Sequence, residues 1–190
     1  YNFLLRSVEQ ALLRYFTYDE AEGLKYVRGL LRKEKSPAQR AILQAVLDKF
    51  TEIAGMEFDF KPTSSGESQR LYFFQKYTIY EALRMPHVII ANEQGLGKTI
   101  TCLGLINGQE AVIIAPNSVV TTWAEQEGKF FEQANLEVLE GTYRERLQNL
   151  ATLERPQVVT NVEFTRGMTV QRAAALSRPE GFLVVDEADY

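Results

Sequence analysis

The chain has 190 residues, of which 45% are hydrophobic, and this is typical of one globular domain or of a domain with a smaller appendage. One cysteine and one histidine exclude a disulfide framework and a structural zinc site built on Cys and His. The net charge is −4, with 10 basic and 10 acidic residues in 1–68 and 11 and 15 in 69–190. No basic stripe therefore indicates a broad nucleic-acid surface.

The sequence also disfavours a membrane-spanning protein and a secreted one. No apolar run approaches the roughly 20 residues that span a bilayer, and no signal-peptide pattern is present. We expect no membrane partner and an intracellular location: cytoplasm or nucleoid in a prokaryote, nucleus in a eukaryote. The chain begins at Tyr1 rather than Met, so we expect the natural start to lie upstream. Cys102 is interpreted as a small core residue rather than a reactive thiol.

Residues 1–60 predict a small all-helical region. Thr17 with Glu20, and Ser36 followed by Pro37, have the residue types of helix N-termini. Apolar residues recur at helical spacing in three stretches: Leu5, Val8, Leu12 and Phe16; Leu24, Val27 and Leu31; Ile42, Val46, Phe50 and Ile53. We interpret the region as a packed accessory bundle, with a regulatory or partner-docking role as the alternative.

Residues 61–68 are polar and rich in turn formers, so we expect a linker there and a second domain over residues 69–190. In that domain helical segments alternate with short β-rich runs, at 88–91, 111–115, 136–139, 157–160 and 182–185. The alternation predicts an α/β fold, with a parallel sheet covered by helices on both faces. Ligands bind such sheets at the carboxyl ends of strands, so the segments after 91 and after 185 are expected to converge.

The segment after residue 91 reads Asn-Glu-Gln-Gly-Leu-Gly-Lys-Thr and departs from the phosphate-loop pattern G-x-x-x-x-G-K-[ST] only at Asn92. Its glycines allow backbone N–H groups to close around phosphate oxygens, Lys98 supplies a positive charge, and Thr99 offers a hydroxyl to magnesium. The helix that follows adds its positive end. The alternative is a glycine-rich turn without a ligand. The predicted ATP-binding residues of the loop are Asn92, Glu93, Gln94, Gly95, Leu96, Gly97, Lys98 and Thr99.

A second motif, Asp186-Glu187-Ala188-Asp189, follows the last apolar run. By itself it could be acidic surface at the end of a strand. Together with the loop it gains a mechanism, because Asp186 can hold magnesium through water while Glu187 orients and deprotonates the attacking water. We therefore assign catalysis to Lys98, Asp186 and Glu187, and magnesium binding to Thr99 and Asp186.

These motifs resemble those of Swi/Snf-type DNA translocases of helicase superfamily two, whose phosphate loop reads D-E-M-G-L-G-K-T-I. The resemblance extends over most of residues 68–190. Residues 71–75 are similar to the family segment whose glutamine reads adenine, and residues 114–123 and 159–163 to two motifs that reach toward nucleic acid. The resemblance implies the first RecA-like motor lobe of an ATPase that moves along duplex DNA.

By the same resemblance, Gln75 would pair with the adenine edge, with a solvated helix residue as the alternative. Backbone and hydroxyl groups around four residues would touch the phosphates of one strand without reading sequence: Asn117, Ser118, Thr160 and Asn161. We interpret Trp123 as helix-to-sheet packing rather than as a base-stacking residue. The partners would be duplex DNA and the second RecA-like lobe of the same protein.

Three positions depart from the family pattern: Asn92 replaces Asp, Gln94 replaces Met, and Asp189 replaces a frequent His. Nucleotide binding should survive Asn92. Asp189 bears on how the nucleotide state is coupled to nucleic acid, because a carboxylate cannot reproduce the hydrogen bonds of an imidazole.

Two alternatives remain. Residues 186–189 spell the acidic box of DEAD-type RNA helicases, although residues 95–97 and 116–118 are closer to the Swi/Snf pattern. A non-catalytic nucleotide-binding or interaction module is the other. The family has a further strand after the acidic box, and a second lobe whose arginines complete the ATP site. Such an arginine is worth about 10³ to 10⁵ in rate, so we expect this segment to be a fragment that binds ATP and Mg²⁺ with little turnover.

Overall fold

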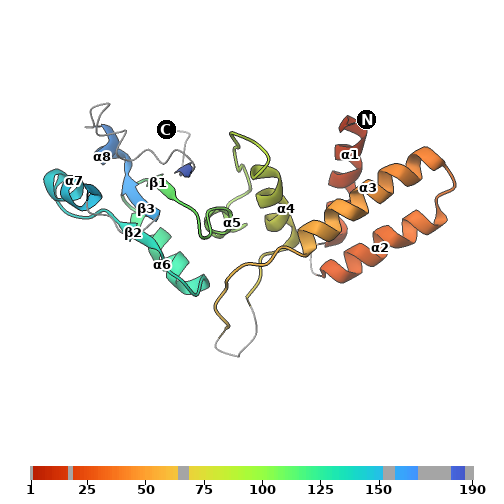
Figure 1. Cartoon of the computed structure of the whole chain (residues 1–190), viewed down its shortest axis with the longest axis horizontal. Helices are drawn as coiled ribbons and strands as arrows, with labels where there is room; N and C mark the ends of the chain where they lie inside the picture. The colour runs from red at the N-terminus through yellow and green to blue at the C-terminus, as the bar shows by residue number, and fades with distance from the viewer. Residues whose placement is uncertain (1, 17–18, 64–68, 152–156, 167–180, 187–190) are drawn as a thin grey trace. The chain divides into compact units, whose positions relative to one another are not determined.

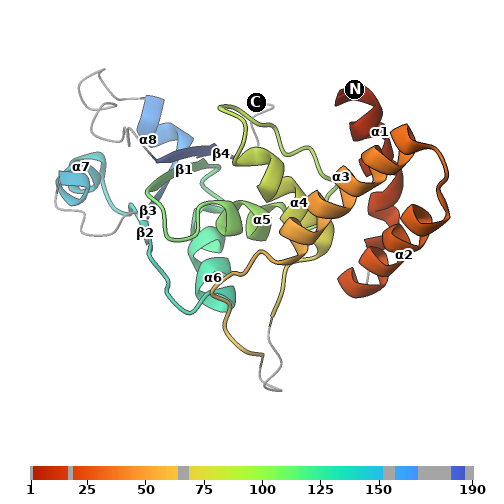
Figure 2. The ribbon, with the colours of Figure 1, turned by 45° about the vertical axis from the view of Figure 1, so that its right-hand side comes forward.

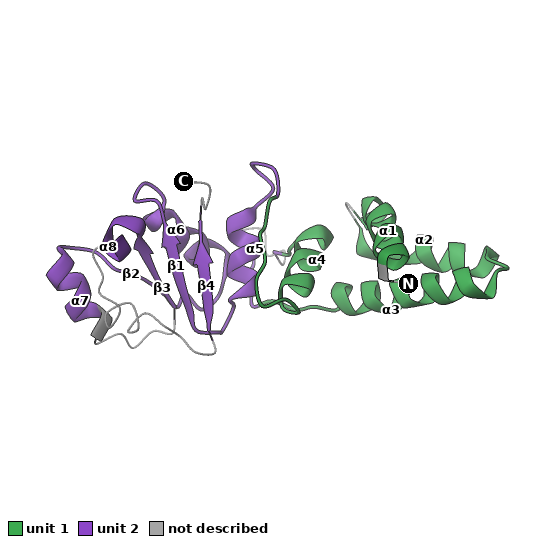
Figure 3. Ribbon diagram, turned by 90° about the horizontal axis from the view of Figure 1, so that it is seen from above, with its two compact units in different colours: residues 1–58, 70–91 green, residues 59–69, 92–190 purple. Residues whose placement is uncertain are grey.

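A computed structural model of the chain describes residues 2–16, 19–63, 69–151, 157–166 and 181–186 (Figure 1). The chain forms two compact units, which are coloured separately in Figure 3: residues 1–58 with 70–91, and residues 59–69 with 92–190. The first unit consists of helices, and the second contains the sheet. Within the described part of the chain, no helix has the length and apolar character needed to cross a membrane.

The first unit contains four α-helices and a short 3-10 helix: α1 (Asn2–Leu13), η1 (Arg14–Phe16), α2 (Glu20–Lys33), α3 (Pro37–Ala54) and α4 (Phe73–Ala82). Ser36 caps α3 and Pro37 opens it, as predicted. The cap of α2 is Asp19, whose carboxylate accepts from the N–H of Ala21 at 2.7 Å. Thr17, the residue predicted to cap this helix, lies outside the described residues.

Aromatic rings hold the first unit together. The rings of Phe16 and Phe73 stack with centroids 4.2 Å apart, and Phe50 meets Phe73 edge-on at 5.3 Å. Tyr77 and Tyr80 of α4 are buried in the same core. With a linker at residues 61–68, the predicted domain boundary places α4 in the second domain. In the structure, the aromatic side chains of α4 pack against the N-terminal helices.

A buried carboxylate links three helices of this unit. Glu9 of α1 is only 1% exposed and accepts from the ammonium group of Lys49 at 2.7 Å and from the hydroxyl of Tyr77 at 2.8 Å. Lys49 also pairs with Glu81 at 2.7 Å. Burial, followed by the hydrogen bond to Glu9, raises the pKa of Tyr77 above its usual range. The network thus satisfies a charge that would otherwise be costly to bury.

The second unit contains the predicted parallel sheet, with strand order β2-β3-β1-β4 (Figure 3). Its described elements in chain order are α5 (Lys98–Leu105), β1 (Ala111–Ala115), α6 (Val120–Phe130), β2 (Leu136–Val138), α7 (Tyr143–Ala151), β3 (Gln157–Asn161), α8 (Val162–Arg166) and β4 (Phe182–Val185). Four of the five predicted β runs are therefore strands, with ends that differ by at most one residue.

Helices cover both faces of this sheet, which confirms the predicted α/β architecture. Alternate residues of β1 point to opposite faces. Ile113 packs in a core with Leu103 of α5 and Trp123 of α6. Val112 packs in a separate core with Phe164 of α8. In Figure 2, α5 and α6 lie on one side of the strands and α8 on the other.

The prediction of a strand at residues 88–91 is wrong. These residues have no regular secondary structure, and none of the described strands pairs with them. Ile89 is 91% exposed and Val88 is 43% exposed. A strand requires a hydrogen-bonded neighbour as well as an apolar, β-branched composition, and only the composition is visible in the sequence.

The Glu9 network can be tested by removing its cation. We expect Lys49→Met to lower the local stability of α1, α3 and α4 by about 3 kcal/mol, because it leaves a buried carboxylate without its cation. Native-state hydrogen exchange of amides in these helices measures the loss without requiring the two units to unfold together. Lys25→Met, at an exposed position of α2, is the matched control and should change protection by less than about 0.5 kcal/mol. Equal effects of the two substitutions would contradict this account.

Candidate functional site

The segment from Asn92 to Thr99 forms a tight loop that ends on the first turn of α5. Gly95 and Gly97 have φ angles of 85° and 72°, which are in the left-handed region that glycine adopts without strain. Gly97 is the residue that caps α5, and Lys98 is the first residue of the helix. The loop therefore ends at a helix N-terminus. The first backbone N–H groups of a helix have no partners within the helix and can bind an anion.

Two side chains of the loop have chemistry that suits a phosphate. The ammonium group of Lys98 donates to the backbone carbonyl of Asn92 at 3.0 Å, so the lysine folds over the loop that it follows. The side-chain nitrogen of Asn92 is shielded from solvent and has no hydrogen-bond partner within the described structure. An unpaired buried donor costs about 1 to 3 kcal/mol. A phosphate oxygen can accept from both groups, so the residues present fit an anionic ligand.

The other loop residues leave the backbone open to a ligand. Glu93, Gln94, Gly95 and Leu96 are exposed, and Thr99 is half-buried in the first turn of α5. Within the loop the N–H of Leu96 also donates to the carbonyl of Glu93 at 3.3 Å.

The acidic residue Asp186 comes directly after β4. Its N–H donates to the carbonyl of Ile114 at 2.8 Å, which continues the pairing of β4 with β1 by one residue. Its carboxylate accepts from the indole N–H of Trp123 at 3.0 Å. Burial first, and then the charge of Asp186, raise the pKa of the Cys102 thiol to about 11. Trp123, which holds this carboxylate, packs in one core with Leu103 of α5.

These positions suit a magnesium ion that is shared with a nucleotide. Within the described residues no group of three or more His, Cys, Asp or Glu side chains could hold a metal by themselves. Magnesium needs no such cluster, since it usually keeps several waters and binds one or two carboxylates together with substrate phosphates. Thr99 and Asp186 offer the hydroxyl and the carboxylate. Glu187 and Asp189 lie outside the described residues.

Two of the predicted nucleic-acid residues meet at the same edge of the sheet. The side-chain nitrogen of Asn161, the last residue of β3, donates to the side-chain oxygen of Asn117, which follows β1, at 2.8 Å. The side-chain oxygen of Asn161 accepts from the N–H of Phe164 at 2.9 Å and from Arg146 at 3.0 Å. Asn161 is thus held firmly, while Asn117 and Ser118 are exposed.

A glycine-bounded loop at a helix N-terminus, and an acidic residue after the neighbouring strand, are the features by which the sequence resembles a motor lobe. The family model described as SNF2-related domain matches residues 10–189. The chain belongs to the SNF2-related family. A comparison with curated proteins finds no match. This match confirms the resemblance to Swi/Snf-type proteins. The chain is therefore a Snf2-family motor domain, and the family is one of helicase-like ATPases.

One predicted contact of this SNF2-related domain has a different environment from the one expected. Thr160 lies in the middle of the sheet with an exposed fraction of 0%, and its hydroxyl has no partner among the described residues. Burial on a sheet face covered by a helix keeps this hydroxyl away from solvent, and so from a phosphate. Of the four predicted residues, Asn117 and Ser118 are exposed beyond the end of β1, whereas Asn161, the last residue of β3, is buried.

The predicted adenine-reading residue, Gln75, belongs to α4 in the first unit. It is 4% exposed, and its side-chain oxygen accepts from the N–H of Tyr72 at 2.9 Å. The alternative of a solvated helix residue is therefore wrong. Gln75 acts here in a capping arrangement at the start of α4, and its contact with adenine stays a prediction.

Trp123 packs as the sequence indicated, but it also has a polar role that we missed. It is 2% exposed in the core between α6 and the sheet, which confirms the packing interpretation. The sequence contained one signal of its bond to Asp186, because a buried indole N–H usually finds an acceptor. Nothing in the sequence indicated which acceptor. Arg146, which holds Asn161, was missed for the same reason.

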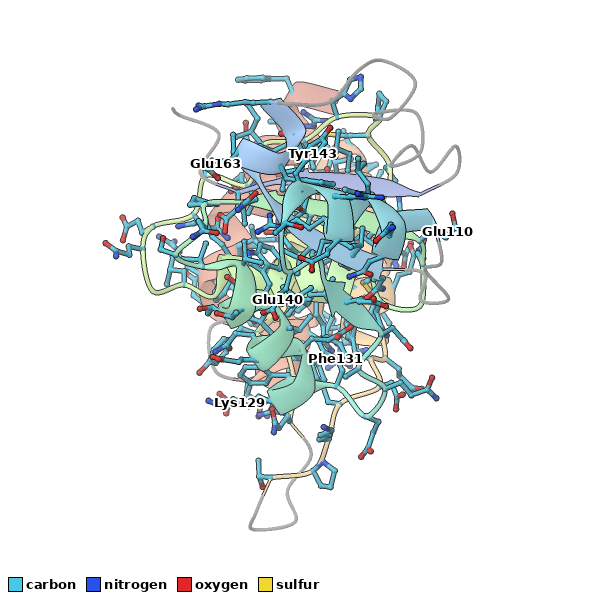
Figure 4. The ribbon with its side chains drawn as sticks, turned by 90° about the vertical axis from the view of Figure 1, so that its left-hand side faces the viewer. Glu110, Lys129, Phe131, Glu140, Tyr143 and Glu163 are labelled. Carbon is cyan, nitrogen blue, oxygen red and sulfur yellow. The ribbon has the colours of Figure 1, made fainter. Side chains whose placement is uncertain are left out.

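Acidic side chains surround part of this SNF2-related domain. Figure 4 labels Glu110, Glu140 and Glu163, which come from different parts of the second unit and are all exposed. Such side chains repel phosphates, which disfavours a broad nucleic-acid surface on this part of the unit.

The loop conformation can be tested at Gly95. A Cβ atom there would have open space around it, so Gly95→Ala isolates the effect of the positive φ angle. We expect the substitution to destabilise the loop by about 1 to 2 kcal/mol, measured as faster hydrogen exchange at residues 93–99. The control is Gly128→Ala in α6, which also has open space and should be neutral or stabilising. Unchanged exchange in Gly95→Ala would show that the loop does not depend on this conformation.

Proposed function

We propose that this SNF2-related domain is the ATP-binding first motor lobe of a DNA-dependent translocase, which hydrolyses ATP when a second lobe completes the site. The observation that carries the proposal is the loop from Asn92 to Thr99, with its left-handed cap at Gly97 and with Lys98 at the start of α5. The carboxylate of Asp186 supports it, because Trp123 holds that carboxylate and packs in one core with Leu103 of α5.

Each residue has a separate task under this proposal. The N–H groups of the loop and the start of α5 would bind phosphate oxygens, and Lys98 would exchange its bond to Asn92 for the terminal phosphates. Thr99 and Asp186 would hold Mg²⁺, which supplies charge stabilisation for phosphoryl transfer when bound. Glu187 would orient the attacking water. The proposed adenine contact is Gln75.

Duplex DNA is the proposed partner outside the ATP site. Asn117 and Ser118 follow β1, are exposed and offer an amide and a hydroxyl to a phosphate backbone, and the buried Asn161 at the end of β3 holds Asn117 through its side-chain amide. Groups of this kind position a strand and carry no sequence information. The acidic surface limits the salt-dependent attraction to these few contacts.

The catalytic assignment predicts that two substitutions in the complete protein stop ATP turnover. Lys98→Ala should reduce turnover by about 10² to 10³-fold through loss of phosphate stabilisation. Glu187→Gln should abolish turnover while ATP still binds, because the amide cannot accept the proton of the attacking water. Steady-state ATPase rates and nucleotide binding measure the two effects, and Lys129→Ala, at an exposed position near the end of α6, is the control. Turnover that survives both changes contradicts the assignment.

The nucleic-acid partner can be tested with the same complete protein. We expect duplex DNA of any sequence to stimulate ATPase activity, and Asn117→Ala to raise the DNA concentration needed for half-stimulation several-fold. Stimulation by RNA alone would overturn the choice of DNA and favour an RNA helicase. ATP binding without turnover under any condition would favour a nucleotide-binding module.

A further inference from the structure

The bond between Trp123 and Asp186 joins two elements of the second unit that are 63 residues apart in sequence. Both ends of the bond are fixed. The indole is 2% exposed in the core between α6 and the sheet, and the backbone of Asp186 is tied to Ile114 at 2.8 Å. The 3.0 Å distance from Nε1 to Oδ2 is that of a well-formed hydrogen bond.

Packing alone does not account for the indole. Phe131 belongs to the same core and is as buried as Trp123, and it fills its space without a polar atom. A tryptophan brings an N–H donor that must find an acceptor once it is buried. Here the acceptor is the acidic residue that follows β4, and not a backbone carbonyl of the sheet.

We propose that Trp123 is a positioning residue for the magnesium site, and that its indole N–H holds the carboxylate of Asp186 in the orientation that binds Mg²⁺ with ATP. The inference rests on the function proposed above. A carboxylate has two oxygens and accepts several hydrogen bonds, so it can accept from an indole and from a metal-bound water together.

The physical consequence is that metal binding needs less reorganisation. A carboxylate at the end of a strand can rotate about its side-chain bonds, and each orientation lost on binding lowers affinity. A donor fixed in the core removes part of that cost before the metal arrives. Partners that hydrogen-bond to metal ligands in this way typically contribute 10- to 100-fold to metal affinity.

The test uses the complete protein and the substitution Trp123→Phe, which keeps an aromatic ring in the core and removes the N–H donor. We expect the apparent affinity for Mg²⁺ with ATP present to fall about 10-fold, measured by titrating Mg²⁺ against binding of a fluorescent ATP analogue. Binding of the same analogue in EDTA should stay within two-fold of wild type. A purely structural role would weaken both measurements together.

Two further variants calibrate the result. Phe131→Leu disturbs the same core without touching Asp186, so it should lower thermal stability and leave the affinity for Mg²⁺ unchanged. Asp186→Asn removes the carboxylate charge and sets the size of a full loss of metal binding. Circular dichroism of each variant identifies any that has not folded.

A second measurement keeps the inference falsifiable if Trp123→Phe does not fold. Trp123 is the only tryptophan of these 190 residues, so its emission can be isolated in the complete protein after replacing any tryptophan outside them by phenylalanine. Because the indole N–H touches the metal-binding carboxylate, addition of Mg²⁺ to the ATP-bound protein should shift this emission. EDTA should reverse the shift.

The outcomes separate this inference from the proposed function. Unchanged Mg²⁺ affinity in Trp123→Phe, alongside a loss in Asp186→Asn, overturns the positioning role and leaves the ATP site intact. An emission that does not respond to Mg²⁺ also overturns it. A wild-type protein that binds no ATP overturns the proposed function itself, and with it the premise of this inference.

Discussion

Parallel pairing of β1 with both of its neighbours is the constraint on which the candidate site depends. Ala115 of β1 lies opposite Asn161 of β3, and Ile114 lies opposite Val185 of β4. Because all strands run the same way, their carboxyl ends meet along one edge, and the residues that follow them are brought together. Asn117, Asn161 and Asp186 reach that edge from three separate parts of the sequence.

The phosphate loop depends on a different constraint. Its two glycines have left-handed φ angles, and Lys98 donates to the carbonyl of Asn92. Residues 88–91, which precede the loop, pair with none of the described strands. Leu103 of α5 and Ile106, which follows the helix, pack in one core with β1 and α6, and the loop and Asp186 belong to the same unit.

Local patterns predicted most of the fold, and long-range contacts explain what they missed. The apolar stripes that contain Phe16 and Phe50 predicted their helices, and the short apolar run at 111–115 between helical segments predicted a buried strand. Residues 88–91 have the composition of a strand but pair with none of the described strands, and composition alone does not indicate whether a partner strand is present. The burial of Thr160 and the bond from Trp123 to Asp186 both depend on packing between segments that are far apart in the chain. Such contacts depend on strand order and register, which periodicity leaves open.

The buried polar groups distinguish the candidate site from the rest of the sheet. The side chains of Trp123 and Asn161 have hydrogen-bond partners inside the described structure. Trp123 thereby holds Asp186, and Asn161 holds Asn117. The side-chain nitrogen of Asn92 and the hydroxyl of Thr160 have no partner among the described residues, and an unpaired buried polar group raises the free energy of the folded state. Only Asn92 belongs to the loop where an anion fits. Under the proposed function a phosphate would supply the missing acceptor, so that nucleotide binding would relieve a cost present in the ligand-free loop. The loop would then be stabilised by its ligand in proportion to the logarithm of ligand concentration.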